Sequence, residues 1–567
     1  MGLGPTTRLK SITLRFVAAI WLLAGLQAAM GGSDAMAAPI PAGDSANVKV
    51  WVQFRDKGPG KRPLRSLDYE NLPIHEPYLR ALVSLGFACD ARLKWQNRVS
   101  GRIARDLLPR LASLPPVASV SPLARKLPRP VPRPGTRYLP WNPRGSAKAA
   151  AQRGGAADTL DYGPLAPVLE SLQVQKVHAL LEKAGKPPGR GVRIAVIDAD
   201  FLLGHSVFAP LFAEGRIRDQ WDFVENRPQA VTRDLGPSHG ANCLSLLAGN
   251  LPGTLVGLAP AAEYLLYRAE DESQERYVEE DYVAAAIERA VDSGAQVINI
   301  SLSYRFEYSD GSPDLPYMAM DGRTRPSSLA ALGAARRNVL VAVAVGNLPD
   351  SLPRTPSIEA PGDADSILAV GIADHRRRKC SYACRGPTAD GRIKPDVVTM
   401  GLTEFCFVPV VNPGSQAGLS LEAGTSFASP VVAGIAALLW QALPNPSAQK
   451  IRSALMASAH LGNRPDDSLG FGLVDALAAL QGTRPVLPGS ALAERGAVKV
   501  YHAGGRLPLE LPYLAGAKAA GVQVHDLAGR RVRVKVGGFG ARMLLEPFSE
   551  LSPGIYIISR ASARSGG

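Results

Sequence analysis

The chain has 567 residues, of which 46% are hydrophobic, and carries a formal charge of +14 at pH 7. This hydrophobic content excludes a chain that is disordered throughout, and the length suffices for about three domains. The positive charge lies largely in the N-terminal segment and in one Pro-rich stretch, and no zinc-finger or RNA-binding motif accompanies it. We therefore expect no nucleic-acid partner.

The first 37 residues are typical of a secretory signal peptide. Basic residues stand at Arg8, Lys10 and Arg15, an apolar core runs from Phe16 to Ala29, and Ala35-Met36-Ala37 has the A-x-A form of a cleavage site. The core is shorter than a membrane helix, and no other stretch reaches the roughly 18 uninterrupted apolar residues that such a helix needs. We expect a soluble mature protein without a membrane span, secreted or held at the cell surface.

Residues 38–123 predict a small α+β domain, and residues 124–159 predict a linker. The domain is expected to follow the order β-α-β-β-α-β over about 80 residues. The pattern marks three of these four strands, at 48–54, 93–99 and 117–120, and both helices, at 78–85 and 103–114. The following stretch is basic, rich in proline and without periodicity, so we expect it to be exposed and accessible to proteases.

From residue 160 to residue 483, fully apolar strands alternate with helices. The strands are expected at 192–197, 263–267, 297–302, 339–345 and 367–372, and the helices at 172–181, 241–248, 282–292, 329–337 and 447–457. This alternation predicts an α/β domain with a mostly parallel sheet covered on both faces. Functional groups gather at the carboxyl ends of such strands, where Asp198, Ser301 and Asn347 stand.

Residues 484–567 predict a third kind of structure. Short segments separated by Gly-rich turns indicate a small antiparallel β-sandwich. The expected strands are 498–501, 507–511, 522–525, 531–536, 543–546 and 555–559.

The stretch Gly424-Thr425-Ser426-Phe427-Ala428-Ser429-Pro430 leads into an apolar run and predicts the start of a buried helix. Ser426 would then lie at a helix N-terminus, where unpaired backbone N–H groups can receive a developing oxyanion. Two interpretations are open at this point. Ser426 is a catalytic nucleophile, or Thr425, Ser426 or Ser429 is only the N-cap of a core helix.

Three further positions supply the partners that a serine nucleophile needs. A serine hydroxyl requires a neutral imidazole as base, a carboxylate to orient that imidazole, and donors for the oxyanion. Asp198 ends an apolar strand, His239-Gly240 opens a helix, and Asn347 follows an apolar strand. The sequence thus offers one candidate for each role, in the order Asp, His, Ser.

Seven segments in order along the chain carry a more specific pattern. They are Ala195-Val-Ile-Asp198, Ser238-His-Gly240 with Ala248-Gly249, Gly257-Leu-Ala-Pro260, Val297-Ile-Asn-Ile-Ser-Leu302, Ala344-Val-Gly-Asn347, the stretch from Arg385 to Asp396, and the stretch from Gly424 to Gly434. Over residues 160 to about 480 the chain resembles the subtilase family of serine endopeptidases, and the order Asp, His, Ser is that of subtilisin.

The resemblance implies a subtilisin-like three-layer α/β fold with a mostly parallel sheet. It also implies hydrolysis of peptide bonds through an acyl-enzyme, without a required cofactor. Ser426 would be the nucleophile, His239 the general base, Asp198 the carboxylate that orients it, and Asn347 the oxyanion donor.

The resemblance further predicts how a polypeptide binds and how the enzyme is made. An extended substrate would pair with Ser301-Leu302-Ser303 as an added strand, and Ala344 and Gly346 would lie beside the pocket for the residue before the scissile bond. Residues 38–123 resemble a subtilase propeptide, an intramolecular inhibitor and folding aid, so we expect a zymogen. Residues 484–567 resemble the sorting domain of type IX secretion cargo, and a generic accessory β-domain is the alternative.

Three places depart from the family pattern. After the candidate aspartate, Ala199 and Asp200 stand where a small hydroxyl residue and glycine are usual; Ala241 replaces a usual threonine, and Ser303 a usual glycine. Each alanine removes a supporting hydroxyl, at a cost of about 1 kcal/mol. Ser303 is expected to narrow the pocket. Asp200 either perturbs the pKa of the histidine or faces solvent, and we expect the latter.

Other acidic residues and one histidine have structural interpretations. His205 lacks the glycine and helix that follow His239, so we expect a structural role. Asp222, Asp234 and Asp396 are expected to be solvated or to cap a turn. The acidic groups 271–272 and 279–281 either bind calcium or form a solvated face, and we favour the solvated face because no EF-hand spacing is present.

The five cysteines do not predict a metal site. No Cys/His spacing resembles that of zinc ligands. Cys380, Cys384 and Cys406 are close enough in sequence for one pair to form a disulfide in an exported protein, and which pair stays open.

The leading prediction is a secreted serine endopeptidase made as a zymogen. The alternative is a catalytically impaired binding or scaffold protein on a subtilase fold, which the altered neighbours of Asp198 and His239 support. An α/β-hydrolase esterase is disfavoured, because Gly-Thr-Ser-Phe-Ala lacks the G-x-S-x-G form and Asp precedes His.

Overall fold

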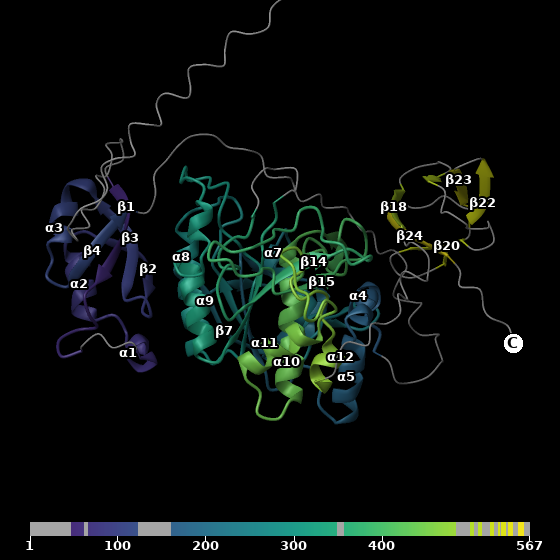
Figure 1. Cartoon of the computed structure of the whole chain (residues 1–567), viewed down its shortest axis with the longest axis horizontal. Coiled ribbons are helices and arrows are strands. Elements are labelled where there is room, and N and C mark those ends of the chain that lie inside the picture. The colour runs from purple at the N-terminus through teal and green to yellow at the C-terminus, as the bar shows by residue number, and fades with distance from the viewer. Residues whose placement is uncertain are drawn as a thin grey trace, which may run out of the picture. The chain divides into compact units, whose positions relative to one another are not determined.

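The computed structural model describes residues 47–61, 66–122, 160–348 and 356–482, together with the backbone of the strands between residues 499 and 560 (Figure 1). The predicted signal peptide (1–37) and the predicted linker (124–159) lie outside the described residues.

Residues 47–122 form an antiparallel sheet with the strand order β2-β3-β1-β4. The elements are β1 (Asn47–Phe54), α1 (Leu67–Asn71), α2 (Glu76–Ser84), β2 (Ala88–Leu93), β3 (Arg98–Ala104), α3 (Leu108–Ala112) and β4 (Val117–Pro122). Val50, Val52, Leu82, Val99 and Leu111 are fully buried and form the core. Apart from the additional short helix α1, this is the predicted order β-α-β-β-α-β.

Two boundaries predicted in this region are wrong. The strand predicted at 93–99 is a hairpin, because β2 ends at Leu93 and the chain reverses through Asn97, which has a φ of 52°. Leu93 and Val99 are both buried on either side of this turn, so their alternation imitates one strand. The helix predicted at 103–114 begins only at Leu108, because β3 continues to Ala104 and a 3-10 turn follows it.

Residues 160–482 are built around a parallel sheet of seven strands in the order β15-β14-β13-β12-β5-β11-β7. The strands are β5 (Arg193–Asp198), β7 (Ile217–Asp222), β11 (Glu263–Arg268), β12 (Val297–Ile300), β13 (Leu340–Ala344), β14 (Leu368–Ala373) and β15 (Val397–Met400). The five predicted strands are all present. Two strands were not predicted from the sequence: β7, a largely polar edge strand, and β15, which has only four residues.

Helices cover both faces of this sheet and give the predicted three-layer α/β fold (Figure 1). One face carries α5 (Val174–Lys183), α7 (His239–Ala248), α10 (Ser429–Ala442), α11 (Ala448–Ser458) and α12 (Ala476–Gln481); the other carries α8 (Glu279–Asp292) and α9 (Pro326–Arg336). Ile194 and Val196 of β5 belong to the first core, and Ala195 and Ile197 to the second. Successive side chains of a strand point to opposite faces, so β5 anchors both cores.

Short elements complete this region. They are α4 (Ala166–Ser171), α6 (Ala209–Ala213), the parallel pair β6 (Phe201–Leu202) and β8 (Val231–Thr232), and two antiparallel pairs, β9 (Asn250–Leu251) with β10 (Leu255–Val256) and β16 (Val408–Val411) with β17 (Leu419–Glu422). A disulfide joins Cys380 to Cys406, whose Cα atoms are 6.3 Å apart. Cys384 is buried and free, so the pairing left open by the sequence is settled.

The apolar helix after Gly424 is a core helix. Residues 425–442 are long and apolar enough to cross a membrane by length and composition, but 83% of this window is buried inside the protein. Among the described residues no other helix meets the same test. The uniform hydrophobicity of α10 therefore reflects burial on all sides, as the sequence predicted.

The strands near the C-terminus form two antiparallel sheets, of order β18-β24-β20-β21 and β19-β23-β22. Their bounds are β18 (Lys499–Ala503), β19 (Leu509–Pro512), β20 (Val522–Asp526), β21 (Arg531–Val532), β22 (Val534–Phe539), β23 (Arg542–Pro547) and β24 (Gly554–Arg560). Two sheets agree with the predicted sandwich. The strand predicted at 531–536 is divided between β21 and β22, which lie in different sheets.

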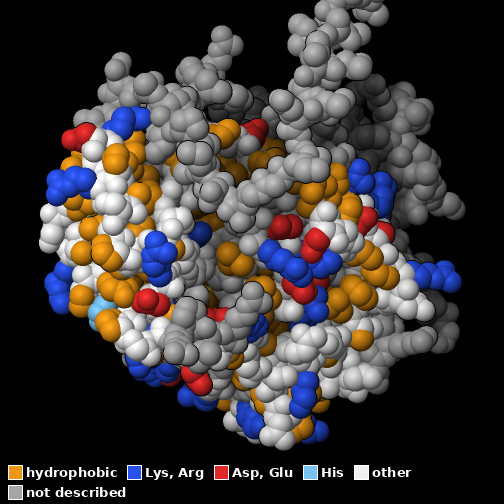
Figure 2. Space-filling model, turned by 60° about the vertical axis from the view of Figure 1, so that its left-hand side comes forward, with side chains coloured by type: hydrophobic (Ala, Val, Ile, Leu, Met, Phe, Trp, Pro, Cys, Tyr) orange, Lys and Arg blue, Asp and Glu red, His pale blue; other side chains and the backbone are white. Residues whose placement is uncertain are grey.

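The face in Figure 2 carries basic side chains that are scattered among acidic and apolar ones. The positive charge of the sequence is therefore not gathered into one continuous basic surface on this face.

The acidic residues at the start of α8 are buried, so the solvated face predicted for them is wrong. Glu279, Glu280 and Asp281 have no exposed surface. The carboxylate of Glu280 accepts hydrogen bonds from the guanidinium of Arg325, at 3.0 Å from Nε, and from the hydroxyl of Ser327 at 2.9 Å. The N-terminus of a helix also favours negative charge. Charged partners and the position at a helix N-terminus together explain how three consecutive acidic residues can be buried.

Asp281 joins α8 to the N-terminal sheet. Its carboxylate accepts the indole N–H of Trp51 at 2.7 Å and lies 3.8 Å from the guanidinium of Arg98. That guanidinium stacks 4.5 Å from the centre of the Trp51 ring. A residue of the α/β domain is thus satisfied by side chains that come from about 200 positions earlier in the chain.

The turn between β2 and β3 contacts both α8 and α9. The carboxylate of Glu288 accepts the backbone N–H groups of Lys94 and Trp95 at 2.8 and 3.0 Å. The Trp95 ring lies 4.0 Å from the guanidinium of Arg337. A Cβ added at Gly333 would come within 2.7 Å of the Trp95 ring, so glycine makes room for the indole on α9.

Of the three aspartates predicted to be solvated or to cap a turn, two are buried in ion pairs. The carboxylate of Asp396 forms ion pairs with the ammonium of Lys394 at 2.6 Å and with the guanidinium of Arg452 at 2.8 Å. Asp222 is also buried and pairs with two arginines, and its Oδ1 caps the following turn, as predicted, by accepting the backbone N–H groups of Val224 and Glu225 at 3.0 Å. Asp234 is exposed, as predicted. Solvation was expected because both aspartates were taken to lie in loops, whereas Asp222 ends the edge strand β7 and Asp396 directly precedes the buried strand β15.

Replacement of Asp396 by asparagine is expected to lower the free energy of unfolding by about 3 kcal/mol, because Lys394 is buried and would lose its counter-ion. Denaturant titration followed by tryptophan fluorescence measures this loss. Asp234→Asn is the matched control at an exposed site and should stay within about 0.5 kcal/mol of the wild type. Equal stabilities for the two variants would contradict the role of the buried pair.

Candidate active site

Asp198 lies at the carboxyl end of β5 and is fully buried. Its Oδ1 accepts a hydrogen bond from Nδ1 of His239 at 2.6 Å and another from the backbone N–H of Ala199 at 2.8 Å. Its Oδ2 has no hydrogen-bond partner within the described residues. The carboxylate is therefore directed at the imidazole and held by one of its two oxygens.

His239 is the first residue of α7, and its place depends on the residues on either side. Ser238 caps the helix, because its hydroxyl oxygen accepts the backbone N–H of Ala241 at 3.2 Å. Gly240 lies against the carbonyl oxygen of Asp200, which a Cβ at this position would strike. The Ser-His-Gly sequence is thus explained locally: serine begins the helix, and glycine lets it approach the end of β5.

Asp200 does not face solvent freely, which corrects the expectation from the sequence. Its Oδ1 accepts the hydroxyl hydrogen of Ser238 at 2.7 Å, so the carboxylate supports the cap of α7. Burial raises the pKa of Asp200 to about 6, against the opposite effect of the Ser238 hydrogen bond. On the other side of the helix start, Glu272 accepts the backbone N–H of His239 at 3.1 Å.

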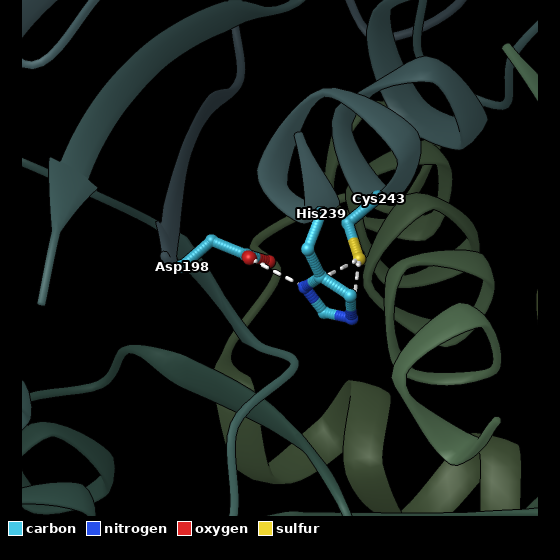
Figure 3. Close-up of side chains that lie close together, drawn as sticks. All are labelled: Asp198, His239 and Cys243. Atoms are coloured by element: carbon cyan, nitrogen blue, oxygen red, sulfur yellow. Dashed lines mark hydrogen bonds and ion pairs between the residues drawn. The ribbon is translucent and has the colours of Figure 1, made fainter. Parts of the chain in front are cut away.

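Cys243 is a neighbour of the imidazole that the sequence analysis did not identify. It lies one helical turn after His239, and its Sγ is 3.9 Å from Nδ1 and 4.0 Å from Nε2 (Figure 3). The same thiol approaches the backbone carbonyl oxygen of Ser426 at 3.5 Å. The i, i+4 spacing on α7 was the available signal, since it places position 243 over the face that carries the histidine.

The electrostatics favour a protonated Nδ1 on His239. Burial lowers the pKa of His239, but its neighbours Cys243 and Asp198 outweigh that effect and hold the pKa above its ordinary value. Because burial raises the pKa of the Cys243 thiol to about 11, this thiol is neutral near pH 7. The negative charge that acts on the imidazole is therefore that of Asp198.

Asp198, His239 and Cys243 also form the group of described residues whose atoms could hold a metal ion, since one ligand atom of each lies within 4.8 Å of the others. A metal requires the thiolate form of cysteine and a free imidazole nitrogen. Here the thiol is neutral and Nδ1 is bonded to the carboxylate. The arrangement suits an acid–base pair better than a metal site.

Ser426 lies in the turn before α10, where residues 425–427 form a 3-10 helix. Its hydroxyl donates to the carbonyl oxygen of Ser301 at 3.0 Å, and its own carbonyl oxygen accepts the Ser301 hydroxyl at 2.8 Å. Neither this turn nor α10 has a side-chain cap, so the interpretation of Thr425, Ser426 or Ser429 as an N-cap is wrong. Ser429 instead donates its hydroxyl hydrogen to Asn299 at 2.7 Å.

Within the described residues no hydrogen bond joins Ser426 to His239. The two residues are neighbours through Cys243 and through Phe427, whose ring centre lies 5.6 Å from that of the imidazole. Hydroxyl groups rotate readily, and catalytic hydrogen bonds often form only when substrate is bound. The Ser426 turn thus lies next to the base, while the Ser426 hydroxyl is bonded to a backbone oxygen.

Asn347 follows β13 and is oriented by the same turn. Its side-chain Oδ1 accepts the backbone N–H of Thr425 at 2.9 Å and the Thr425 hydroxyl at 3.1 Å. The amide oxygen of Asn347 is thus bonded to Thr425, whereas its Nδ2 has no acceptor among the described residues and can donate to a ligand. The backbone N–H of Ser426 has no backbone partner in the described part of the chain. The hydrogen bonds to Thr425 thus hold the Asn347 side chain beside the turn that carries Ser426.

Of the other predicted residues, Ser301, Leu302 and Ser303 follow β12 directly, and Ala344 and Gly346 end and follow β13, its neighbour in the sheet. One residue beside them was not predicted from the sequence: Glu359 is buried, and its carboxylate lies between Ser303 and Gly346. Its signal was an acid between the two apolar residues Ile358 and Ala360. His205 has the structural role predicted for it: it is buried, and its Nε2 donates to the carbonyl oxygen of Gly418 at 2.8 Å.

Comparison with known proteins places this geometry in a family. The family model of the Subtilase family matches residues 189–472, half of the chain. Thermitase of Thermoactinomyces vulgaris is 28% identical over 324 residues, which cover 56% of this chain and 100% of thermitase. Mycosin-1 of Mycobacterium tuberculosis is 29% identical over 346 residues, covering 53% of this chain and 71% of the mycosin.

A third relative shares only part of its length with this chain. Subtilisin-like protease SBT6.1 of Arabidopsis thaliana is 26% identical over 306 residues, which cover 51% of this chain and 26% of the plant protein. The region matched by the family model contains Asp198, His239, Asn347 and Ser426. The three-layer fold, the order of these residues and the match over half of the sequence lead to one conclusion: the chain belongs to the subtilase family of serine proteases.

Proposed function

We propose that this protein is a serine endopeptidase in which Ser426 attacks the carbonyl carbon of an extended polypeptide. The observation that carries the proposal is the 2.6 Å hydrogen bond from His239 Nδ1 to Asp198, next to the Ser426 turn. This bond fixes the tautomer in which Nε2 is the basic nitrogen of the imidazole. An imidazole in that state can accept a proton from a serine hydroxyl.

Substrate binding would release the nucleophile. The Ser426 hydroxyl is bonded to the carbonyl oxygen of Ser301, the first residue of the segment expected to pair with substrate. A substrate backbone N–H that occupies this oxygen would free the hydroxyl to rotate towards Nε2 of His239. The bond that keeps Ser426 away from its base in the free protein would thus be exchanged for a bond to substrate.

The chemistry then follows in two halves. Nε2 of His239 takes the Ser426 proton while Oγ bonds to the carbonyl carbon, and the oxyanion is bound by Asn347 Nδ2 and the Ser426 N–H. The tetrahedral intermediate collapses, and His239 gives its proton to the departing amine, which leaves an acyl-enzyme. A water that loses a proton to His239 hydrolyses the ester and restores the serine.

Ser426→Ala is expected to lower peptide hydrolysis by about 10⁶-fold and to abolish labelling by a fluorophosphonate probe. Casein hydrolysis and in-gel fluorescence measure the two effects, and circular dichroism checks the fold. Ser429→Ala tests the other buried serine of the same segment and should still be labelled. A wild-type protein that the probe does not label would favour the binding or scaffold alternative.

The dependence of hydrolysis on pH should report the Asp198–His239 pair. Only the neutral imidazole can act as base, and its pKa lies above the ordinary value of 6.5, so kcat/KM is expected to rise with pH through a midpoint above 6.5. Asp198→Asn should lower kcat/KM by about 10⁴-fold and shift the midpoint down. Cys243→Ala removes a neutral group and should shift the midpoint less; a larger shift than that of Asp198→Asn would contradict the assignment.

We also infer that the protein is exported by residues 1–37 and made as a zymogen, with residues 38–123 as the propeptide and an activation site between about residues 124 and 160. The support for the second step is the contact of the N-terminal sheet with α8 and α9 through Trp51, Arg98 and the β2–β3 turn. This contact is made by hydrogen bonds to buried carboxylates, and such directional bonds form only when the two surfaces are correctly aligned.

Trp51→Phe removes the indole N–H and leaves the Asp281 carboxylate without its shortest hydrogen bond. The yield of active secreted enzyme, counted by fluorophosphonate titration, is expected to fall by about tenfold, since a lost bond to a charged group costs about 1.5 to 3 kcal/mol. N-terminal sequencing of the active form should give a start between residues 124 and 160. Val83→Ala, at an exposed site of the same domain, is the control, and equal yields would argue against a folding role.

A further inference from the structure

A buried carboxylate lies between the two segments expected to border the substrate pocket. Oε2 of Glu359 accepts the hydroxyl hydrogen of Ser303 at 2.6 Å, and Oε1 lies 3.4 Å from the thiol of Cys384. On the opposite segment, a Cβ added at Gly346 would come within 2.6 and 2.8 Å of the two carboxylate oxygens. The carboxylate therefore fills the space that glycine leaves open and reaches across to Ser303.

The backbone holds this carboxylate in place. Tyr304 and Ala360 exchange two backbone hydrogen bonds, of 2.8 and 3.2 Å, so the residues next to Ser303 and Glu359 are paired. The backbone N–H of Cys384 donates to the carbonyl oxygen of Gly346 at 3.1 Å. Glu359 is 7% exposed and cannot turn outwards without breaking this frame.

The charge of Glu359 is not matched by a contacting cation. Among the described residues no lysine or arginine nitrogen lies within 4.0 Å of its carboxylate. Arg305 acts on it from further away, and the Arg305 guanidinium donates to the carbonyl oxygens of Pro356 and Ile358. By contrast, the buried Glu280 contacts Arg325. Glu359 thus has hydrogen-bond donors but lacks an ion-pair partner.

Burial accordingly raises the pKa of Glu359 to about 7, against the opposite effects of the Ser303 and Cys384 hydrogen bonds and of the Arg305 charge. The ionised form of a buried carboxylate that lacks a counter-ion is stabilised strongly when a ligand brings a cation into contact with it. An apolar side chain in the same place would instead take away its remaining water, which costs free energy.

We propose that Glu359 is a specificity-determining residue that selects polypeptides with arginine or lysine immediately before the scissile bond. The proposal rests on the proposed peptidase function of the same site. A guanidinium or ammonium that enters between Ser303 and Gly346 meets the carboxylate oxygens and supplies the missing counter-ion. A guanidinium can donate two parallel hydrogen bonds, one to each oxygen of a carboxylate, so we expect arginine to be favoured over lysine.

Matched substrates separate charge from shape. Fluorogenic peptide amides that differ only in arginine, citrulline or phenylalanine before the cleaved bond are compared, since citrulline has nearly the shape of arginine without its charge. The wild type is expected to give a kcat/KM for arginine about 30-fold or more above that for citrulline. Glu359→Gln should reduce this ratio by about 10- to 100-fold while hydrolysis of the citrulline peptide changes little.

Asp363→Asn is the control for loss of a buried carboxylate in the same segment. Asp363 bonds to the hydroxyl of Ser328 and to the backbone N–H of Gly322, away from the pocket residues, so this variant should keep the wild-type ratio. A wild type that prefers phenylalanine, or a Glu359→Gln variant with an unchanged ratio, would overturn the proposal.

Binding of p-aminobenzamidine tests the pocket without catalysis. This fluorescent cation resembles the arginine side chain, and the Ser426→Ala protein is expected to bind it at least about tenfold more tightly than the Ser426→Ala, Glu359→Gln double variant. If the protein binds p-aminobenzamidine but the wild type hydrolyses no peptide, the proposed peptidase function is contradicted and the acidic pocket is supported. Hydrolysis of phenylalanine peptides without benzamidine binding would keep the proposed function and overturn this inference.

Discussion

The active site depends on the close approach of α7 to the carboxyl end of β5. Gly240 permits that approach, because any side chain there would strike the carbonyl oxygen of Asp200. The approach brings His239 to within 2.6 Å of Asp198, and one turn later it brings Cys243 against the Ser426 carbonyl oxygen. Since β5 packs helices on both of its faces, a shift of this strand would disturb the base and both cores together.

The departures from the family pattern change the hydrogen bonds around Asp198 and His239 but leave the hydrogen bond between these two residues in place. Ala199 still donates its backbone N–H to Asp198, and Ala241 still donates its own to the Ser238 cap. What is missing is a partner for Oδ2 of Asp198, which the described residues leave unbonded. Neither Ala199 nor Ala241 carries a hydroxyl that could donate to that oxygen.

The sequence predicted the elements whose signals are local, and it failed where a partner distant in the chain decides. The buried strands around Asp198 and the turn at Ser426 were predictable because apolar runs and glycines mark them directly. The acids from Glu279 to Asp281 were taken for a solvated face, since neither Arg325 nor Trp51 can be inferred as their partner from position.

Ser303 and Glu359 are best understood as one feature. From the sequence, Ser303 was a single departure that narrows a pocket, and Glu359 was not noticed. In the structure the Ser303 hydroxyl donates to the Glu359 carboxylate across 56 positions of sequence, so the serine supplies a bond that a glycine could not. A glycine at position 303 would leave a buried carboxylate short of a donor, at a cost of about 1 to 3 kcal/mol. Gly346 must in turn stay small, because the carboxylate occupies the place of its missing Cβ. Each of the three residues is therefore explained by the other two, which is why no single position of the sequence could reveal this contact.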